Sequence, residues 1–195
     1  TKKKQKNNRP DDRPRVSRLI PLVRVHSRMA FPLPPASSAL ALDIDGTITP
    51  ADQTVVLNLV DAARALGAHV AINTARPTQY CDSPFEMTSR LAAREHHHCC
   101  AWALRDLLFG SSASQLAQVP LCKVSNMDAI AGASGVRRRA CAILVDDRPE
   151  NVLAVSRAGY TGVLVDARSG ITEAVAHSLL RQLERCAAWE DEVAT

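Results

Sequence analysis

The sequence predicts an α/β fold, a doubly wound and mainly parallel sheet that helices cover on both faces. From Ala39 onward, short apolar runs alternate with segments whose apolar residues recur at helical spacing. Strands that are apolar throughout are typical of parallel sheets buried between two layers of helices. A chain of 195 residues is also long enough to bury a core in one domain of ordinary size.

Four apolar runs are expected to form the strands of this sheet. They lie at residues 39–44, 69–73, 141–145 and 161–166. Runs of this length, rich in Ala, Val, Ile and Leu and separated by longer segments, are consistent with buried strands.

The first helix is expected between the first two strands, with Gly67 as its C-terminal cap. A second is expected from Ser83, because an N-cap residue is followed there by Pro84 and, three residues after the cap, by Glu86. That helix would run to about residue 95. The apolar residues that define the first helix are Val55, Val56, Leu59, Val60, Ala63 and Leu66.

The second half of the chain contains three further predicted helices. A short one starts at Ser125, another covers residues 149–158, and a closing helix presents one apolar face. Residues 96–120 are ambiguous, with either a helix or a strand near residues 102–109. The face of the closing helix consists of Ile171, Val175, Leu179 and Leu183.

Residues 1–35 form a basic, proline-containing extension. They carry a net charge of +8, whereas residues 36–195 carry −4. The extension has no sustained periodicity, so we expect it to be disordered and residues 36–195 to form the folded domain. Three interpretations are open for this extension. The favoured one is a solvated segment, or one added to the natural protein, and the others are a targeting peptide and a nucleic-acid contact.

The six cysteines contain no CxxC pair and follow no dense framework. Cys122 and Cys141 lie in apolar surroundings, where buried free thiols are common, so a reducing compartment is expected. This favours the cytoplasm, or an organelle if residues 1–35 are a transit peptide. No apolar run approaches the 18 residues of a membrane span, so we expect a soluble protein.

The run His96-His97-His98-Cys99-Cys100 invites interpretation as a zinc site. Consecutive residues do not readily converge on one ion, and zinc ligands are normally spaced. A polar loop or helix end with two partly buried thiols is the favoured interpretation.

Two pairs of acidic residues follow buried strands. Asp43 and Asp45 come after the first run, and a strand period of two would direct both side chains the same way. Asp146 and Asp147 end the third run. Two carboxylates about 5 Å apart repel by roughly 3 kcal/mol at an effective dielectric near 20, so they need a cation, a shared proton or full solvation.

Ligands of open α/β sheets bind beyond the carboxyl ends of the strands. Both acidic pairs and Thr74 occupy such positions, so we expect them to converge although they are far apart in sequence. Clustered carboxylates suit a hard cation such as Mg²⁺. An isolated Asp at a strand end is often only a helix N-cap, but one cap does not need two acids on the same face.

These residues resemble the motif set of the haloacid dehalogenase superfamily of phosphohydrolases. The first motif matches Leu42-Asp43-Ile44-Asp45-Gly46-Thr47, and the second matches Ala71-Ile72-Asn73-Thr74. Lys123 matches the lone lysine of the third motif, and Leu144-Val145-Asp146-Asp147 with Asn151 matches the acidic fourth. The motifs occur in the family's order, and the resemblance covers roughly residues 39–166.

The resemblance implies roles for the acidic residues. Asp43 would be the nucleophile that forms an aspartyl phosphate, and Asp45 would protonate the leaving group and then activate water. Mg²⁺ would be bound by the carboxylates of Asp43 and Asp146 and by the backbone carbonyl of Asp45. Asp147 would bind the ion directly or through water.

The resemblance also implies that Thr74 donates a hydrogen bond to the phosphate and that Lys123 supplies a second cation. Gly46 would let nearby backbone amides turn towards the phosphate. Arg76 and Arg148 flank the predicted site as candidate substrate contacts, and an exposed or salt-bridged arginine is the alternative for each. Asn151 would brace the metal-binding loop or only occupy the first turn of its helix.

The expected function is therefore that of a Mg²⁺-dependent phosphomonoester hydrolase. A non-catalytic binding module, a nucleic-acid end-processing phosphatase guided by residues 2–28 and a phosphomutase are the alternatives. Only a few residues separate Thr47 from the first helix, so no large cap domain is expected there. A small lid at residues 96–120 or an oligomer partner would then limit access of a phosphorylated substrate, whose class the sequence does not indicate.

Overall fold

The computed structural model describes residues 36–77, 90–92, 96–100 and 117–194, and the side chains of the last helix as far as Trp189. These elements belong to one unit, Leu33–Thr195. Three predictions lie outside the described residues: the disordered extension at 1–35, the helix start at Ser83 and the element at 102–109.

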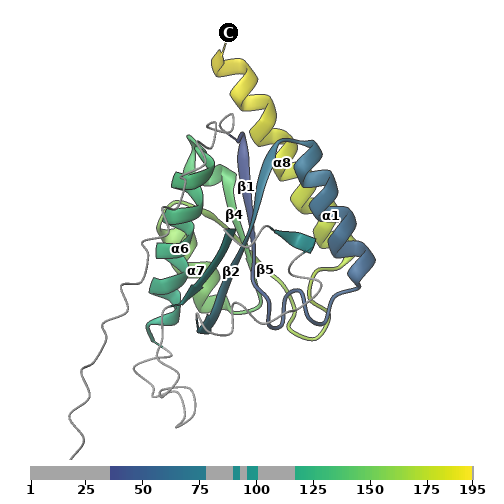
Figure 1. Ribbon diagram of the computed structural model, residues 1–195, viewed down its shortest axis with the longest axis vertical. Helices are drawn as coiled ribbons and strands as arrows, with labels where there is room; N and C mark the ends of the chain where they lie inside the picture. The colour runs from purple at the N-terminus through teal and green to yellow at the C-terminus, as the bar shows by residue number, and fades with distance from the viewer. Residues whose placement is uncertain (1–35, 78–89, 93–95, 101–116, 195) are drawn as a thin grey trace, which may run out of the picture. The chain divides into compact units, whose positions relative to one another are not determined.

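Five parallel strands form one sheet in the order β3-β2-β1-β4-β5 (Figure 1). β1 lies in the centre of the sheet. β2 and β3 follow on one side of it, and β4 and β5 lie on the other side. The point where the order reverses, between β1 and β4, is where α/β sheets bind ligands. The strands are β1 (Ser38–Leu42), β2 (Ala68–Pro77), β3 (His97–Cys100), β4 (Ala142–Asp146) and β5 (Thr161–Leu164).

Helices cover both faces of this sheet (Figure 1). On one face lie α1 (Gln53–Ala65) and α8 (Glu173–Ala194), and on the other lie α6 (Val119–Ser134) and α7 (Pro149–Arg157). A short 3₁₀ helix, η2 (Arg139–Cys141), precedes β4. The predicted doubly wound α/β fold is confirmed. Among the described residues, no helix combines the length and apolarity that a membrane crossing requires.

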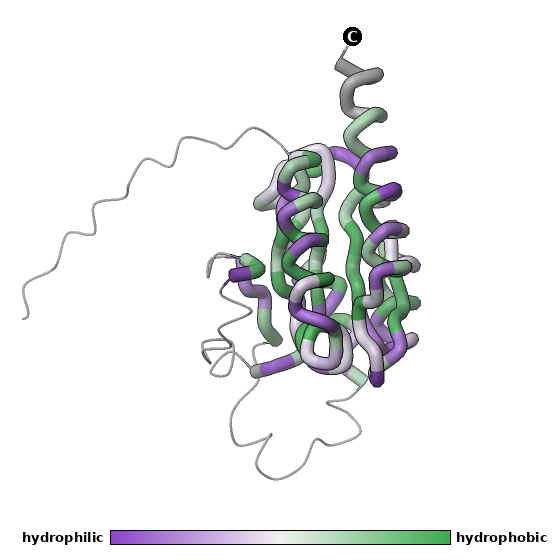
Figure 2. The backbone as a smooth tube through the Cα atoms, turned by 90° about the vertical axis from the view of Figure 1, so that its right-hand side faces the viewer, coloured by the Kyte–Doolittle hydropathy of each residue, from purple (hydrophilic) through white to green (hydrophobic). Residues whose placement is uncertain are grey.

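The strands direct large and small residues to opposite faces. In β1, Leu40 and Leu42 pack in the core beneath α1 and α8, whereas Ala39 and Ala41 pack beneath α6 and α7. This is the period-two alternation of a strand buried on both sides. Along α8, hydrophobic and hydrophilic residues alternate as the helix turns, so that one side faces the core (Figure 2). The small residues of β1 leave room for α6 close to the sheet.

The first predicted helix is confirmed. The side chain of Asp52 caps α1 by accepting a hydrogen bond from the backbone N–H of Thr54 at 2.7 Å. At the other end, Gly67 follows the C-cap residue Leu66 with a φ of +76°, a left-handed conformation that glycine adopts without penalty.

β1, β2 and β5 end at other residues than predicted, and β5 stops at Leu164 rather than at residue 166. β1 ends at Leu42, because the chain turns so that Ile48 and Thr49 both donate backbone hydrogen bonds to the carbonyl of Ile44. β2 continues beyond Asn73 to Pro77, where it pairs with β3 after a shift in register. The backbone N–H of Asp43 still donates to the carbonyl of Val145 in β4, and the chain turns from Asp45 onward, so the strand alternation does not extend to Asp45.

Two other local predictions were wrong. Residues 97–100 form the edge strand β3 rather than a polar loop, because they complete the sheet beside β2. The helix predicted from Ser125 begins at Val119, and Pro120 lies in its first turn. Its buried face includes Lys123, which interrupts the apolar pattern that would have revealed the earlier start.

The expectation of free thiols was wrong. Cys122 is bonded to Cys100, and Cys141 is bonded to Cys186. Cys99 is disulfide-bonded as well, and the described part of the chain contains no free cysteine. The partners of each described pair are 22 and 45 residues apart, a pairing that only the tertiary structure brings about. The described cysteines therefore include no free thiol that would favour a reducing compartment.

No large cap domain is present in the described residues. The connection from β1 to α1 consists only of residues 43–52, which fold into turns beneath the sheet. In the second connection, the described part contains β3 and the short segment 90–92.

The loop before α8 is held against the loop after β1, and this contact yields a stability prediction. A Cβ at Gly170 would lie 2.2 Å from the carbonyl oxygen of Thr47, and the φ of Gly170 is +59°. Gly170→Ala should therefore lower the free energy of unfolding by about 2–3 kcal/mol. Gly132→Ala is the matched control, since its Cβ would meet nothing within 4 Å in helix α6.

Urea unfolding followed by circular dichroism measures both changes. The control should raise the free energy of unfolding by about 0.5–1 kcal/mol, the helix-propensity difference between Gly and Ala. A Gly170→Ala protein as stable as the wild type would show that the two loops are not packed as described.

Candidate active site

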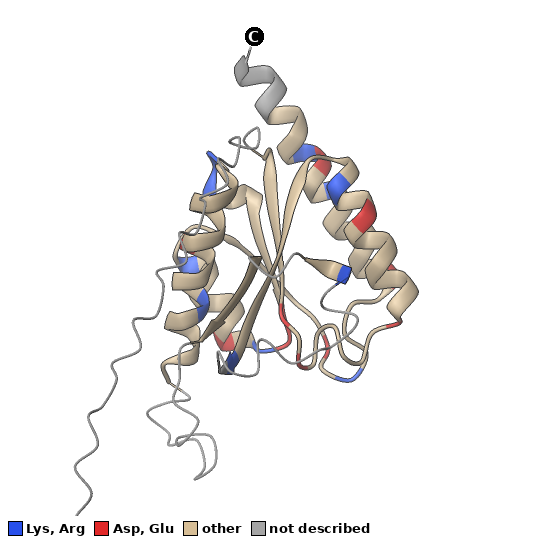
Figure 3. Ribbon diagram, in the orientation of Figure 1, with Lys and Arg blue, Asp and Glu red and all other residues tan. Residues whose placement is uncertain are grey.

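Three carboxylates meet where β1 and β4 end. Asp43 follows β1, Asp146 is the last residue of β4, and Asp147 comes next. One oxygen from each lies within 4.8 Å of the others. Figure 3 shows acidic residues in the loops below the sheet, at the carboxyl ends of the strands. The predicted convergence of Asp43, Asp146 and Asp147 is therefore what the structure shows, at the switch point of the sheet.

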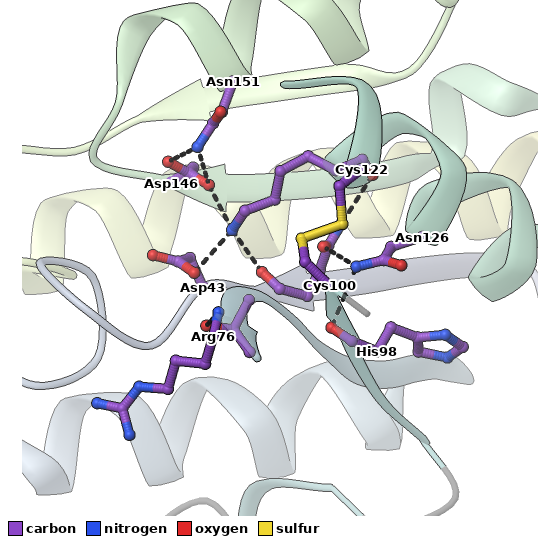
Figure 4. The surroundings of a disulfide bond; sticks show 11 residues. Asp43, Arg76, His98, Cys100, Cys122, Asn126, Asp146 and Asn151 are labelled. Atoms are coloured by element: carbon purple, nitrogen blue, oxygen red, sulfur yellow. Dashed lines mark hydrogen bonds and ion pairs between the residues drawn. A yellow bond between two sulfur atoms is a disulfide. The ribbon is translucent and has the colours of Figure 1, made fainter. Parts of the chain in front are cut away.

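The ammonium group of Lys123 lies between two of these carboxylates, those of Asp43 and Asp146, which are labelled in Figure 4. Its Nζ is 2.7 Å from Oδ1 of Asp43 and 2.8 Å from Oδ2 of Asp146. It also donates to the backbone carbonyl of Asn73 at 2.6 Å. Lys123 has no exposed surface, and Asp43 and Asp146 are buried too. The ammonium thus has three acceptors for its three protons, which is the condition for burying such a charge.

Strand alternation explains why these side chains meet on the α6 side of the sheet. In β4, Ala142 and Leu144 pack towards α6 and α7, and Asp146 continues that series. In β2, Ala71 packs on the same side and Asn73 continues its series. Lys123 then enters from the buried face of α6. Elements from three parts of the chain therefore direct their polar groups to one place.

Two asparagines attach α6 to the sheet near Lys123. Asn73 donates to the backbone carbonyl of Lys123 at 3.0 Å and accepts from the side chain of Asn126 at 2.9 Å. Asn126 also lies 3.2 Å from the carbonyl of His98 in β3. Sequence reasoning assigned these residues no role. The position of Asn73 in an apolar strand could have predicted a structural role, because buried polar groups are nearly always hydrogen-bonded.

Asp146 is oriented by the start of α7. Asn151 donates to both carboxylate oxygens, at 3.0 and 3.2 Å, and the backbone N–H of Arg148 donates to Oδ1 at 2.9 Å. Asn151 is buried. Asn151 therefore does more than occupy the first turn of α7, because its side chain holds the carboxylate of Asp146 in place. The side chain of Arg148 forms an ion pair with Glu150, and its charge also favours the ionised form of Asp147.

Burial and the nearby charge of Asp146 disfavour the ionised forms of Asp43 and Asp147. The pKa of Asp43 rises from 3.8 to about 6, chiefly because burial disfavours the ionised form; Lys123 opposes this and Asp146 adds to it. Burial and the charge of Asp146 also raise the pKa of Asp147. Three carboxylates share one ammonium, so the cluster has an excess of negative charge when it is ionised. A divalent cation would offset that excess, and an all-oxygen donor set suits a hard ion.

Gly46 makes the space that Asp147 occupies. A Cβ at Gly46 would lie 2.4 Å from Oδ2 of Asp147, and the φ of Gly46 is +74°. A side chain there would displace the carboxylate from the cluster. The backbone N–H of Gly46 donates to the hydroxyl of Thr49 at 3.2 Å. The predicted role of Gly46, to let nearby backbone amides turn towards a phosphate, stays a prediction.

Asp45 lies apart from the three clustered carboxylates. Its side chain is 62 % exposed and accepts hydrogen bonds from Nε and Nη2 of Arg76, at 2.8 and 2.5 Å. Asp45 is not in the group of carboxylates whose oxygens lie within 4.8 Å of one another, so its predicted convergence with Asp43 at that distance is not found. The metal contact predicted for Asp45 concerned its backbone carbonyl and stays a prediction. Arg76 is salt-bridged, the alternative considered for it.

Thr74 is buried beside the site, one residue beyond Asn73. Its hydroxyl accepts a hydrogen bond from the backbone N–H of Arg76 at 3.3 Å. Because a hydroxyl accepts and donates at once, its own proton is left for another acceptor. Its predicted contact with a phosphate stays a prediction.

Comparisons with known proteins add the fold and no more. No protein-family model matches the chain, and no curated protein matches its sequence. A crystal structure of an uncharacterized protein from Corynebacterium glutamicum ATCC 13032 Kitasato is similar, with a TM-score of 0.53 and 18% identity. The match covers 76% of this chain and 96% of that one. The shared feature is the α/β fold.

The raised pKa of Asp43 can be measured directly in the metal-free protein. Carbon-13 NMR titration should place it near 6. Asp146→Asn should lower this pKa, because it removes a neighbouring negative charge, and Lys123→Met should raise it further. Since the folded protein binds this proton more tightly than the unfolded chain, the stability due to it is present below pH 4 and lost as pH rises through about 6.

A pKa of Asp43 near 3.8 that neither substitution moves would contradict the described burial and contacts. Asp61→Asn, on the exposed face of α1, is the control and should leave the titration unchanged.

Proposed function

We propose that this protein is a Mg²⁺-dependent phosphomonoester hydrolase that resembles the haloacid dehalogenase superfamily and forms an aspartyl phosphate on Asp43. One observation carries the proposal: the carboxylates of Asp43, Asp146 and Asp147 gather at the switch point of the sheet around the buried Lys123. A carboxylate in such a setting suits nucleophilic attack on phosphorus, because cations next to it reduce its repulsion of an anionic substrate.

Asp43 is the proposed nucleophile. One of its oxygens, Oδ1, is engaged by Lys123, which leaves Oδ2 for attack on the phosphorus atom. Asp43, Asp146 and Asp147 would hold Mg²⁺, whose charge would offset the repulsion between the attacking carboxylate and the phosphate. The resulting acyl phosphate would then be hydrolysed by water, which regenerates Asp43.

Lys123 is assigned a positioning role in this proposal. All three of its protons point at protein acceptors, so none is left for a phosphate oxygen. It fixes the orientation of Asp43 and neutralises part of the charge that Asp43 and Asp146 share. This differs from direct stabilisation of the transition state, the role that the resemblance implies.

Asp45 is the proposed general acid, and Arg76 controls when it acts. Both carboxylate oxygens of Asp45 accept hydrogen bonds from Arg76, so in this arrangement they are directed at the guanidinium group and not at a leaving group. Substrate binding must therefore separate the pair. Asp45 is mostly exposed and Arg76 belongs to the end of β2, so the pair lies where an entering substrate would meet it.

A phosphate-release assay tests the function. The wild-type protein should hydrolyse some members of a broad panel of phosphomonoesters, including p-nitrophenyl phosphate, and EDTA should abolish the activity. Asp43→Asn should lower kcat by at least about 10³-fold, because the amide cannot form the acyl phosphate. Asp61→Asn, an exposed acid on α1, should keep the wild-type rate.

Absence of Mg²⁺-dependent phosphate release from every panel member would refute the enzyme and favour a non-catalytic binding module. Activity that survives Asp43→Asn would refute the assignment of the nucleophile while leaving hydrolysis intact.

A further inference from the structure

A disulfide lies directly beside the residue that organises the site. Cys122 immediately precedes Lys123 in α6, and Cys100 is the last residue of the edge strand β3 (Figure 4). Their Cα atoms are 5.9 Å apart. The bond therefore ties the first turns of α6 to the edge of the sheet at the position of Lys123.

Among the described residues, the beginning of α6 has few other attachments. No side chain caps its N-terminus at Gln118, and no acidic residue lies in its first turn. Leu121 is 70% exposed, whereas Val119 is buried. Caps and first-turn acids stabilise helix starts, and the described part of this helix start has neither.

The next attachment of α6 to β3 is Asn126, which donates to the carbonyl of His98. Lys123 thus lies between the disulfide on one side and the Asn126 contacts on the other. Without the disulfide, the described contacts that would remain to hold the first turns are those of the buried Val119 and Lys123. The position of this helix turn would then depend on the contacts of the Lys123 ammonium group with Asp43, Asn73 and Asp146.

We propose that the Cys100–Cys122 disulfide is a redox-sensitive clamp that sets the activity of the site by fixing the start of α6 and, with it, Lys123. The effect on activity rests on the proposed function, whereas the effect on α6 does not. A dithiol reductant would open the clamp in two steps. One thiolate attacks Cys122 Sγ and displaces the thiolate of Cys100; the second thiol of the reductant then displaces Cys122, so that a cyclic disulfide and two protein thiols result.

Burial indicates which sulfur is attacked. Cys122 is half-buried, whereas Cys100 has no exposed surface. The second described disulfide, Cys141–Cys186, joins the start of β4 to α8, at the opposite end of the strands from the carboxylates. It therefore provides a matched control, a bond of the same kind that does not hold the site.

The experiment compares the oxidised full-length protein with the same protein after dithiothreitol treatment. Alkylation and mass spectrometry identify the opened bond, amide hydrogen exchange follows residues 119–126, and p-nitrophenyl phosphate hydrolysis gives kcat. Reduction should speed exchange at the start of α6 by at least about tenfold and lower kcat by about 10- to 100-fold, because Lys123 would then no longer hold Asp43 in position.

Two double variants assign the effect to one bond. Oxidised Cys100→Ala/Cys122→Ala should match the reduced wild type and should not respond further to dithiothreitol. Cys141→Ala/Cys186→Ala should keep the full response. A Cys100→Ala/Cys122→Ala protein that still responds would overturn the proposal and assign the effect to another disulfide, such as that of Cys99.

Unchanged exchange at residues 119–126 after confirmed reduction of Cys100 and Cys122 would also overturn the clamp. If no sample hydrolyses any phosphomonoester, the proposed function fails, and the exchange comparison still decides whether the disulfide fixes α6.

Discussion

The candidate site depends on a single buried ammonium group. Lys123 brings a positive charge between Asp43 and Asp146, and without it two buried carboxylates would face each other in a poorly solvated place. Carboxylates within 4.8 Å repel by roughly 3 kcal/mol at an effective dielectric near 20. Removing one member of such a buried group leaves an uncompensated charge, which is more costly than removing a surface ion pair.

The rest of the fold positions that charge. The strand order places the ends of β1 and β4 side by side at the switch point, and strand alternation turns Asn73 and Asp146 towards α6. Asn126 and the Cys100–Cys122 disulfide then attach α6 to β3 on either side of Lys123. The contacts of Asn126 and the disulfide therefore have a common effect, because both hold the helix turn that carries Lys123 in one position.

The sequence predicts the fold class and the meeting of the acids, because both follow from apolar runs and from the geometry of parallel strands. It does not predict where β1 stops, since the turn at Ile44 depends on backbone hydrogen bonds that leave no periodic signal. The start of α6 was missed because Lys123 is a polar residue on a buried face. The pairing of Cys100 with Cys122 was missed because it depends on packing between distant segments.

The most direct test observes the ammonium group itself. The chain has only five lysines, and four of them lie within residues 2–6, so nitrogen-15 labelling of lysine gives a simple NMR spectrum. The account predicts one Nζ signal with slowly exchanging protons, coupled through hydrogen bonds to the carboxylates of Asp43 and Asp146 and absent in Lys123→Met. A Lys123 signal that exchanges as fast as free lysine and shows no such coupling would contradict the account.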